Sequence, residues 1–343
     1  MTGTLLKISN LKTQFFAGEG IVRAVDGVDL TISQGETLGV VGESGSGKSV
    51  TAYSVLNLIS YPGRVVAGEV FFRGENLLEK PPEEMKGIQG NKISMVFQEP
   101  MTSLNPVFTI GRQVMEPLIY HKNYSSADAR QEAVILLKLV GIPSAETRID
   151  EYPHQLTGGM RQRVMIAMAL ACRPELLIAD EPTTALDVTI QAQILALMKR
   201  LQKEFGMAIM LITHNLGVVA QMVNRVVVMY AGQVVETGGV ERIFDRPAHP
   251  YTVGLLGSIP KLNERRERLQ VIEGTVPSPR QMPEGCRFHP RCSRVRDICR
   301  QKEPVLVESD PGHEVRCWLY QNSNPESEYR NSKQSQSPND RNE

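Results

Sequence analysis

The residues best suited to chemistry form one short stretch, Gly42 to Ser49, which fits the pattern G-x-x-x-x-G-K-[ST]. Glycines let the backbone curl so that several N–H groups point toward a phosphate, and a following helix adds its positive N-terminal end. Lys48 can reach the β- and γ-phosphates of a nucleotide, and the Ser49 hydroxyl can bind Mg²⁺. The alternative is a chance glycine turn, which an apolar run before the stretch and a helix-compatible segment after it disfavour. The predicted nucleotide contacts are Gly42, Glu43, Ser44, Gly45, Ser46, Gly47, Lys48, Ser49 and Val50.

Polar side chains stand at the ends of three further apolar runs, where α/β folds place their ligands. Asp180 can hold the shell of a Mg²⁺ ion, usually through water, and Glu181 can polarise an attacking water molecule. Gln98 is placed to reach the metal or that water, and His214 is predicted to contact the γ-phosphate. The alternatives are a solvated acidic turn, an isolated surface glutamine and a structural histidine.

Two weaker signals accompany these residues. Thr157-Gly158-Gly159, followed by Met160, opens a predicted helix and repeats the logic of the phosphate loop, although a plain helix cap is the default interpretation. Phe15 and Phe16 fall in a predicted polar turn, residues 14–20, where one of them could stack on a nucleotide base. The alternative for this pair is a hydrophobic plug between strands.

Four cysteines close to the C-terminus form the last chemical signal. Five, six and seventeen residues separate them in order. Four thiolates in a reducing compartment predict one tetrahedral Zn²⁺ ion or one iron–sulfur cluster, and the spacing does not choose between the two. Nearby arginines leave open a nucleic-acid-binding finger. The predicted ligands are Cys286, Cys292, Cys299 and Cys317, whereas Cys172 is expected to be a packed apolar residue.

The elements that must position these residues follow from periodicity and from turn residues. Residues 5–32 alternate like an antiparallel β region, and short apolar strands are predicted at 93–97, 176–180 and 208–213, with a hairpin over 225–236. Helices are predicted at 125–140, 158–172, 188–205 and about 253–259.

The composition is that of an ordinary globular protein. Apolar residues make up 41% of the 343 residues and charged residues 22%, and Lys plus Arg equals Asp plus Glu at 38 each, so no overall field favours nucleic acid. No apolar run reaches the roughly 20 residues that span a bilayer. The N-terminus lacks the pattern of an export signal, so a cytosolic protein, docked on a membrane through other subunits, is expected.

Taken in order, these motifs resemble the ATP-binding subunits of ABC transporters over about residues 5–240. Gly42–Ser49 is similar to the Walker A motif, Gln98 to the Q-loop, Leu156–Gln162 to the signature, Leu176–Glu181 to Walker B, residues 185–187 to the D-loop with Asp187, and His214 to the switch histidine. Phe15 best matches the aromatic A-loop position. Residues 100–106, 152–156, 178–193 and 249–252, with the cysteine region, resemble the dipeptide/oligopeptide importers, and most closely the D-type ATPases of dipeptide permeases.

The resemblance implies an α/β fold: an ABC-type P-loop nucleotide-binding domain with a RecA-like core, an antiparallel β subdomain and a helical signature subdomain, plus a small C-terminal cysteine-rich extension. The expected divisions are an ATPase domain at 1–244, a linker or regulatory segment at 245–283, a four-cysteine module at 284–320 and a disordered polar tail at 321–343. The resemblance also moves the cysteine prediction from zinc to a [4Fe-4S] cluster.

As a mechanism, the resemblance implies ATP hydrolysis at sites shared by two ATPase subunits. Lys48, Gln98, Glu181 and His214 would be catalytic, Ser49, Gln98 and Asp180 would organise Mg²⁺, and Thr157–Met160 would act on ATP bound to the partner. The expected partners are a second, paralogous ATPase subunit, two membrane permeases and a solute-binding protein, at the cytoplasmic side of the inner membrane, with no direct nucleic-acid contact.

Three departures from the family pattern stand out: Thr157 where serine is usual, Met160 in place of glutamine, and Asn215 where aspartate follows the switch histidine. None of them removes a catalytic group, so an active ATPase is expected. The alternatives are a soluble ABC-type ATPase that acts on nucleic acid or ribosomes, and an importer ATPase for nickel or glutathione.

Overall fold

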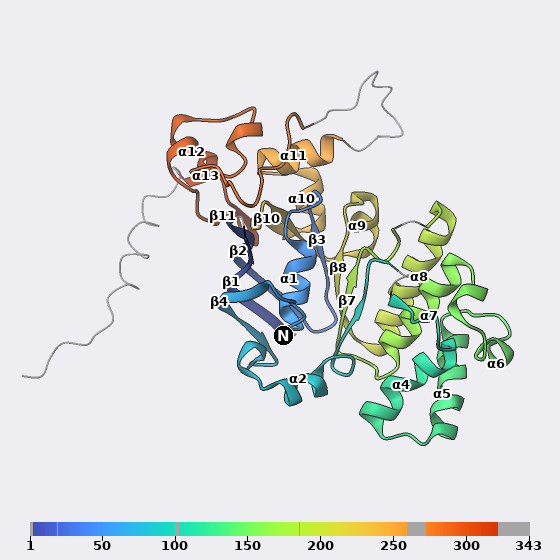
Figure 1. Ribbon diagram of the computed structural model, residues 1–343. Coiled ribbons are helices and arrows are strands. Elements are labelled where there is room, and N and C mark those ends of the chain that lie inside the picture. The colour runs from blue at the N-terminus through green and yellow to red at the C-terminus, as the bar shows by residue number, and fades with distance from the viewer. Residues whose placement is uncertain (1–2, 19, 100–102, 185, 259–271, 322–343) are drawn as a thin grey trace, which may run out of the picture.

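The computed structural model describes residues 3–18, 20–99, 103–184, 186–258 and 272–321. Two sheets form its centre, with one group of helices on one side and the C-terminal segment on the opposite side (Figure 1). Residues 322–343 of the predicted disordered tail, residues 259–271 of the predicted linker and residue 185 of the D-loop lie outside the described residues. Within the described residues, no helix is both long enough and apolar enough to cross a membrane.

The smaller sheet is antiparallel, with its strands in the order β2-β1-β4-β5. Its strands are β1 (Thr4–Ala17), β2 (Gly20–Ser33), β4 (Gly63–Phe72) and β5 (Glu75–Asn76). Phe15 lies opposite Val22 and Phe16 opposite Ile21 in the β1–β2 ladder. The prediction of a polar turn at 14–20 was therefore wrong, because cross-strand apolar partners extend the ladder almost to the tip of the hairpin.

The larger sheet has the order β11-β12-β10-β9-β3-β8-β7-β6. The five strands from β9 to β6 run parallel, and β10, β12 and β11 add antiparallel pairs at one edge. The bounds are β3 (Thr37–Val41), β6 (Ile93–Val96), β7 (Leu176–Asp180), β8 (Ala208–Ile212), β9 (Arg225–Tyr230), β10 (Gln233–Gly239), β11 (Val307–Asp310) and β12 (His313–Val315).

The central strands are apolar along their whole length because both of their faces are buried. In β8, Ile209 and Leu211 belong to the apolar cluster on the helical side, whereas Met210 and Ile212 belong to the cluster that faces the antiparallel sheet. The sheet therefore separates two cores, and its parallel strands direct their carboxyl ends to one edge.

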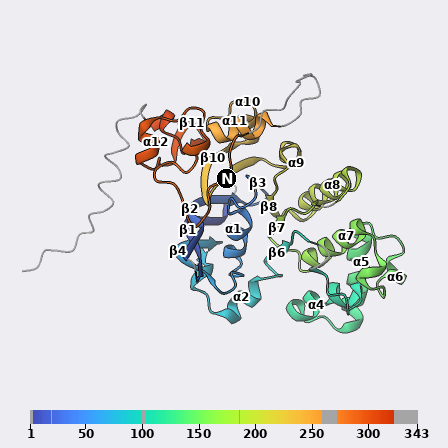
Figure 2. The same cartoon turned by 45° about the horizontal axis from the view of Figure 1, so that its top comes forward.

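Four of the helices form a separate group. Figures 1 and 2 both place α4–α7 together, away from α1. The bounds are α1 (Lys48–Val55), α2 (Pro82–Ile88), α4 (Ile110–Lys122), α5 (Ser126–Leu139), α6 (Ala145–Arg148), α7 (Gly158–Leu170), α8 (Val188–Phe205), α9 (Leu216–Met222), α10 (Val240–Asp245), α11 (Pro250–Gly257), α12 (Asp297–Gln301) and α13 (Trp318–Gln321), with short 3₁₀ turns η1 (Leu77–Glu79), η2 (Pro153–Gln155) and η3 (His289–Arg291).

The C-terminal segment is built onto the larger sheet. In β12, Val315 pairs with Glu236 of β10, and β11 continues the same sheet. A separate cysteine-rich extension is therefore not supported by this fold. The domain divisions at 244/245, 283/284 and 320/321 stay predictions.

Candidate functional site

The phosphate loop lies between the end of β3 and the start of α1, as its sequence pattern predicts. Gly42 has φ 151°, and a Cβ atom there would lie 2.2 Å from the Met229 carbonyl oxygen. Gly47 has φ 99°, and its Cβ atom would lie 2.5 Å from the carbonyl oxygen of Ala24. Both positions therefore require glycine for backbone conformation and for close approach. Ser44 and Gly45 are exposed at the tip of the loop, while Ser46 is buried.

Lys48 folds back over this loop. Its Nζ atom donates to the carbonyl oxygens of Gly42 (2.8 Å) and Glu43 (2.9 Å) and to Ser46 Oγ (3.3 Å). Burial lowers the pKa of Lys48, against the opposing effect of the Glu181 and Asp180 charges. The ammonium is thus held at the loop where phosphate oxygens would compete for its hydrogen bonds.

Ser49 and Asp180 meet behind the loop. Ser49 Oγ donates to Asp180 Oδ1 at 3.0 Å, and Asp180 is fully buried at the end of β7. Asp180 Oδ2 has no hydrogen-bond partner within the described part of the chain. Burial raises the pKa of Asp180, and the Ser49 hydrogen bond opposes that shift. A buried carboxylate oxygen without a partner, beside a hydroxyl and a phosphate loop, fits a Mg²⁺ site.

Two other predicted catalytic residues, Gln98 and His214, contact Glu181. Its carboxylate accepts from Gln98 Nε2 (3.1 Å) and from Thr184 Oγ1 (2.9 Å), and it lies 3.1 Å from His214 Nδ1. Burial alone would raise the pKa of Glu181, but hydrogen bonds from His214 and Thr184 hold it below its ordinary value. Its φ of 46° is unusual for a residue with a side chain and marks a constrained position.

The parallel sheet explains this convergence. Gln98, Glu181 and His214 follow β6, β7 and β8, which are adjacent strands that end at the same edge. Asp180 pairs in register with Ile212, and the Glu181 N–H donates to the Ile212 carbonyl at 2.9 Å. His214 is open to solvent, with 62% of its side chain exposed, compared with 14% for Glu181.

The signature residues lie elsewhere. Thr157 caps α7, its hydroxyl accepting from the Met160 N–H at 3.4 Å. A Cβ atom on Gly159 would lie 2.8 Å from Ile190 Cγ2, so glycine here lets α7 begin close against α8. Asp187 caps α8 by accepting from the Ile190 N–H at 2.9 Å. Within the described residues, no hydrogen bond or ion pair joins Thr157–Met160 to the phosphate loop.

The aromatic pair on β1 is used in two different ways. Phe15 is half-buried, and a Cβ atom on Gly63 would lie 2.6 Å from its ring, so Phe15 packs closely against β4. The ring of Phe16 lies under the Arg64 guanidinium, 4.4 Å from its centroid. That cation already occupies one face of the Phe16 ring. A base-stacking role for Phe15 stays a prediction.

The prediction of a metal or iron–sulfur site at the four cysteines is wrong. Among the described residues, which include all four cysteines, no group of three or more His, Cys, Asp or Glu side chains is placed to hold a metal ion. The thiols instead serve packing: Cys286 and Cys292 contact the main apolar cluster, and Cys317 packs with Ala248 and Val315. Burial raises the pKa of Cys286 to about 12, which keeps that thiol protonated.

Two of the arginines near these cysteines are engaged inside the protein. Arg287 is buried and pairs with Asp26, and the Arg291 side chain, 5% exposed, pairs with Glu43. Arg294, Arg296 and Arg300 are exposed. The nucleic-acid finger is disfavoured because the four cysteines form no metal site among the described residues.

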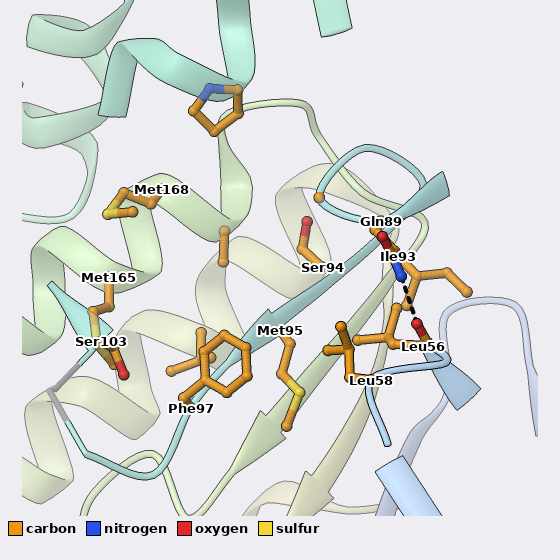
Figure 3. Close-up of a pocket in the computed structure, with 14 residues that line it drawn as sticks. Leu56, Leu58, Gln89, Ile93, Ser94, Met95, Phe97, Ser103, Met165 and Met168 are labelled. Atoms are coloured by element: carbon orange, nitrogen blue, oxygen red, sulfur yellow. Dashed lines mark hydrogen bonds between the residues drawn. The ribbon is translucent and has the colours of Figure 1, made fainter. Parts of the chain in front are cut away.

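An apolar groove of about 250 Å³ runs beside this centre, between β6 and α7 (Figure 3). Met165 and Met168 of α7 line one side, and Leu56 and Leu58 after α1 line the other. Phe97, 39% exposed, lies in the same groove and directly precedes Gln98. The groove thus adjoins a residue that contacts Glu181.

Sequence reasoning missed Thr184 and did not recognise the structural role of Asn215. Thr184 donates to Glu181, and the signal was a hydroxyl three residues after a predicted catalytic carboxylate. Asn215 caps α9, its Oδ1 accepting from the N–H groups of Gly217 (2.9 Å) and Val218 (3.3 Å). An asparagine directly before an apolar helical pattern is a recognisable cap signal. The departure from aspartate at this position therefore preserves a structural role.

Family models match two parts of the chain. Residues 25–184 match the model described as ABC transporter, and residues 235–299 match the model described as oligopeptide/dipeptide transporter, C-terminal region. The solved dimeric structure of the ATP-binding cassette MJ0796 in a post-hydrolysis state with ADP and Pi is 31% identical, with a TM-score of 0.62. That match covers 68% of this chain and 98% of the other.

Two relatives match over most of their length. The oligopeptide transport ATP-binding protein AppD of Bacillus subtilis (strain 168) is 54% identical over 324 residues, which cover 94% of this chain and 99% of AppD. The dipeptide transport ATP-binding protein DppD of Escherichia coli (strain K12) is 49% identical over 313 residues, which cover 91% of this chain and 96% of DppD. The chain therefore belongs to the ATP-binding proteins of the ABC transporter family, in the branch that carries the oligopeptide/dipeptide transporter C-terminal region.

Proposed function

We propose that this protein is the ATP-hydrolysing subunit of an ABC importer for dipeptides and oligopeptides. The observation that carries the proposal is the position of Glu181. Gln98, Thr184 and His214 hold its carboxylate beside the phosphate loop and the buried Asp180. Phosphoryl transfer depends mainly on positioning and on charge stabilisation, and these residues can supply both.

Each residue then has a defined task. Lys48 and the loop amides bind the β- and γ-phosphates, and His214 steadies the γ-phosphate. Ser49, Gln98 and Asp180 would hold Mg²⁺, which neutralises charge on the phosphate oxygens when it is bound. Glu181, kept ionised by its hydrogen bonds, orients the attacking water and accepts its proton.

The active site is proposed to be completed by a second subunit. The signature residues Thr157–Met160 begin α7, which both ribbon views place in the helical group α4–α7, away from α1. Facing a second ATPase subunit, Thr157, Gly158 and Gly159 would contact ATP bound to that partner, with Asp187 near the junction. We propose a paralogous ATPase as this partner, in a heterodimer.

The apolar groove is proposed as the contact with one of the two membrane permeases. Its lining of methionines and leucines suits an apolar segment of a permease, and Phe97 places that segment one residue from Gln98. Movement in the groove would reach Glu181 through a single hydrogen bond of 3.1 Å. The proposed location is the cytoplasmic side of the inner membrane, with peripheral attachment and a solute-binding protein on the other side.

Peptides are proposed as the substrate because the relatives AppD and DppD are named for oligopeptide and dipeptide transport. Nickel and glutathione are the alternative cargoes to be tested beside them. A soluble ATPase that acts on nucleic acid or ribosomes is disfavoured, because the relatives AppD and DppD are named as transport ATP-binding proteins.

The test is reconstitution of the protein with its permeases and its solute-binding protein in proteoliposomes. We expect uptake of labelled di- and oligopeptides that requires ATP and Mg²⁺, and little uptake of nickel or glutathione. ATP hydrolysis that nucleic acid stimulates but peptide-loaded binding protein does not would contradict the proposal.

A further inference from the structure

One residue of the phosphate loop, Glu43, is held by the C-terminal part of the chain. Its backbone N–H donates to the Tyr251 hydroxyl at 2.8 Å, and its carbonyl oxygen accepts from Lys48 Nζ at 2.9 Å. Its carboxylate accepts two bonds from Arg291, at 2.6 Å (Nη1 to Oε2) and 3.0 Å (Nη2 to Oε1). Tyr251 and Arg291 lie 208 and 248 residues further along the chain.

Arg291 is itself fixed in place. Its side chain is 5% exposed, and it also donates to the carbonyl oxygens of Glu273 (3.0 Å) and Ile272 (3.3 Å). Tyr230 lies under it, with the ring centroid 5.8 Å from the guanidinium carbon. A bidentate guanidinium–carboxylate pair with this much support is rigid and geometrically specific.

The two contacts share one apolar base. The rings of Tyr230, Tyr251 and Phe288 pack together, with centroids 4.7 to 5.5 Å apart. Phe288 comes from the same segment as Arg291, so this segment, the end of β9 and α11 form a single support beneath the phosphate loop. The loop therefore has a rigid partner outside the central parallel strands.

We propose that Arg291 is a positioning residue for ATP binding, acting through Glu43, so that the C-terminal segment is a working part of the nucleotide site. Without Arg291, an unpaired carboxylate would stand in the loop that must bind a polyphosphate. That carboxylate would also compete for the Lys48 ammonium, which already contacts the Glu43 carbonyl. The inference rests on the proposed function, because it concerns the same ATP site.

The first experiment measures binding of a fluorescent ATP analogue with Mg²⁺ to the purified full-length protein. Arg291→Met should weaken binding roughly tenfold, the scale of one unscreened charge about 10 Å from the phosphates near a protein surface. Arg316→Met is the matched control, because Arg316 also anchors the C-terminal segment, donating to the carbonyl oxygens of Val234 (2.8 Å) and Pro304 (3.3 Å). We expect Arg316→Met to leave nucleotide affinity within about twofold of wild type.

The second experiment removes the unpaired charge. In the Arg291→Met background, Glu43→Gln should restore most of the lost nucleotide affinity. A separate kinetic measurement uses the transporter complex, in which Arg291→Met should raise KM for ATP with little change in kcat. Equal weakening by Arg316→Met, or no rescue by Glu43→Gln, would show that Arg291 only supports folding, and the proposal would fall.

Two further results, a variant that does not fold and a wild-type protein that does not bind nucleotide, are interpreted separately. If Arg291→Met does not fold, Arg291→Lys decides, since it keeps the charge but loses the bidentate geometry: we expect weaker binding by a few-fold, and unchanged affinity would overturn the proposal. If wild-type protein itself does not bind the ATP analogue, the proposed function fails rather than this inference.

Discussion

The change Glu181→Gln isolates the chemical role of one carboxylate. Gln98 and Thr184 both donate to Oε2, and His214 faces Oε1. A glutamine whose carbonyl oxygen takes the Oε2 position keeps the first two bonds, and its amide nitrogen can donate to His214 Nδ1. The substitution therefore preserves shape and hydrogen bonding and removes the negative charge, and with it the ability to accept a proton.

The expected loss follows from that single missing property. A positioned general base is worth about 10² to 10⁴ in rate, which corresponds to about 2.7 to 5.4 kcal/mol in activation free energy. ATP affinity should not fall, because Lys48, Ser49 and the loop glycines are untouched. The pKa of Glu181 lies below its ordinary value of 4.5, so its carboxylate is lost only as the pH falls through that lowered pKa.

The assay is ATP hydrolysis by the reconstituted complex, together with nucleotide binding, over pH 5 to 8. Glu204→Gln, at an exposed position near the end of α8, is the isosteric control and should hydrolyse ATP at the wild-type rate. Near-normal turnover of Glu181→Gln would refute the reasoning. So would a wild-type rate that halves near pH 6 through titration of Glu181.

Three further predictions concern Asp180, Thr184 and Asn215. Asp180→Asn should weaken Mg²⁺-dependent nucleotide binding by about 10- to 100-fold and leave Mg²⁺-free binding unchanged, as a Mg²⁺ titration at fixed nucleotide will show. Thr184→Val should raise the pKa of Glu181, because a hydrogen bond to the charged form is lost, and move the acid limb of the pH–rate profile to higher pH. Asn215→Ala should lower the free energy of unfolding by about 1 kcal/mol in urea, whereas Asn215→Asp, which can still cap α9, should cost a few tenths.

Much of the central fold could be predicted from the sequence because local pattern and tertiary role agree there. The run Leu176–Asp180 is uninterrupted because β7 is buried on both faces, and the same holds for Ala208–Ile212 in β8. Polar residues directly after such runs must lie at one sheet edge. That rule predicts from the sequence that Gln98, Glu181 and His214 lie together.

Other features depend on partners that no local pattern reveals. Phe15 and Phe16 follow polar residues, yet Val22 and Ile21 across the hairpin keep them in the ladder. The cysteine spacing suggested a metal site because a sequence does not distinguish a metal-binding thiolate from a packed thiol. Only the surroundings of Cys286 and Cys317 show that these thiols face apolar neighbours.

Two residues, Gln98 and Arg291, link the site to its surroundings, and each affects a different step. Gln98 follows the apolar groove and contacts Glu181, so a permease in that groove would act on the water-activating carboxylate. Arg291 comes from the C-terminal segment and contacts Glu43, so that segment would act on the loop that binds phosphates. Hydrolysis and nucleotide affinity can thus be adjusted separately, because among the described residues no hydrogen bond or ion pair joins Gln98 or Glu181 to Arg291 or Glu43.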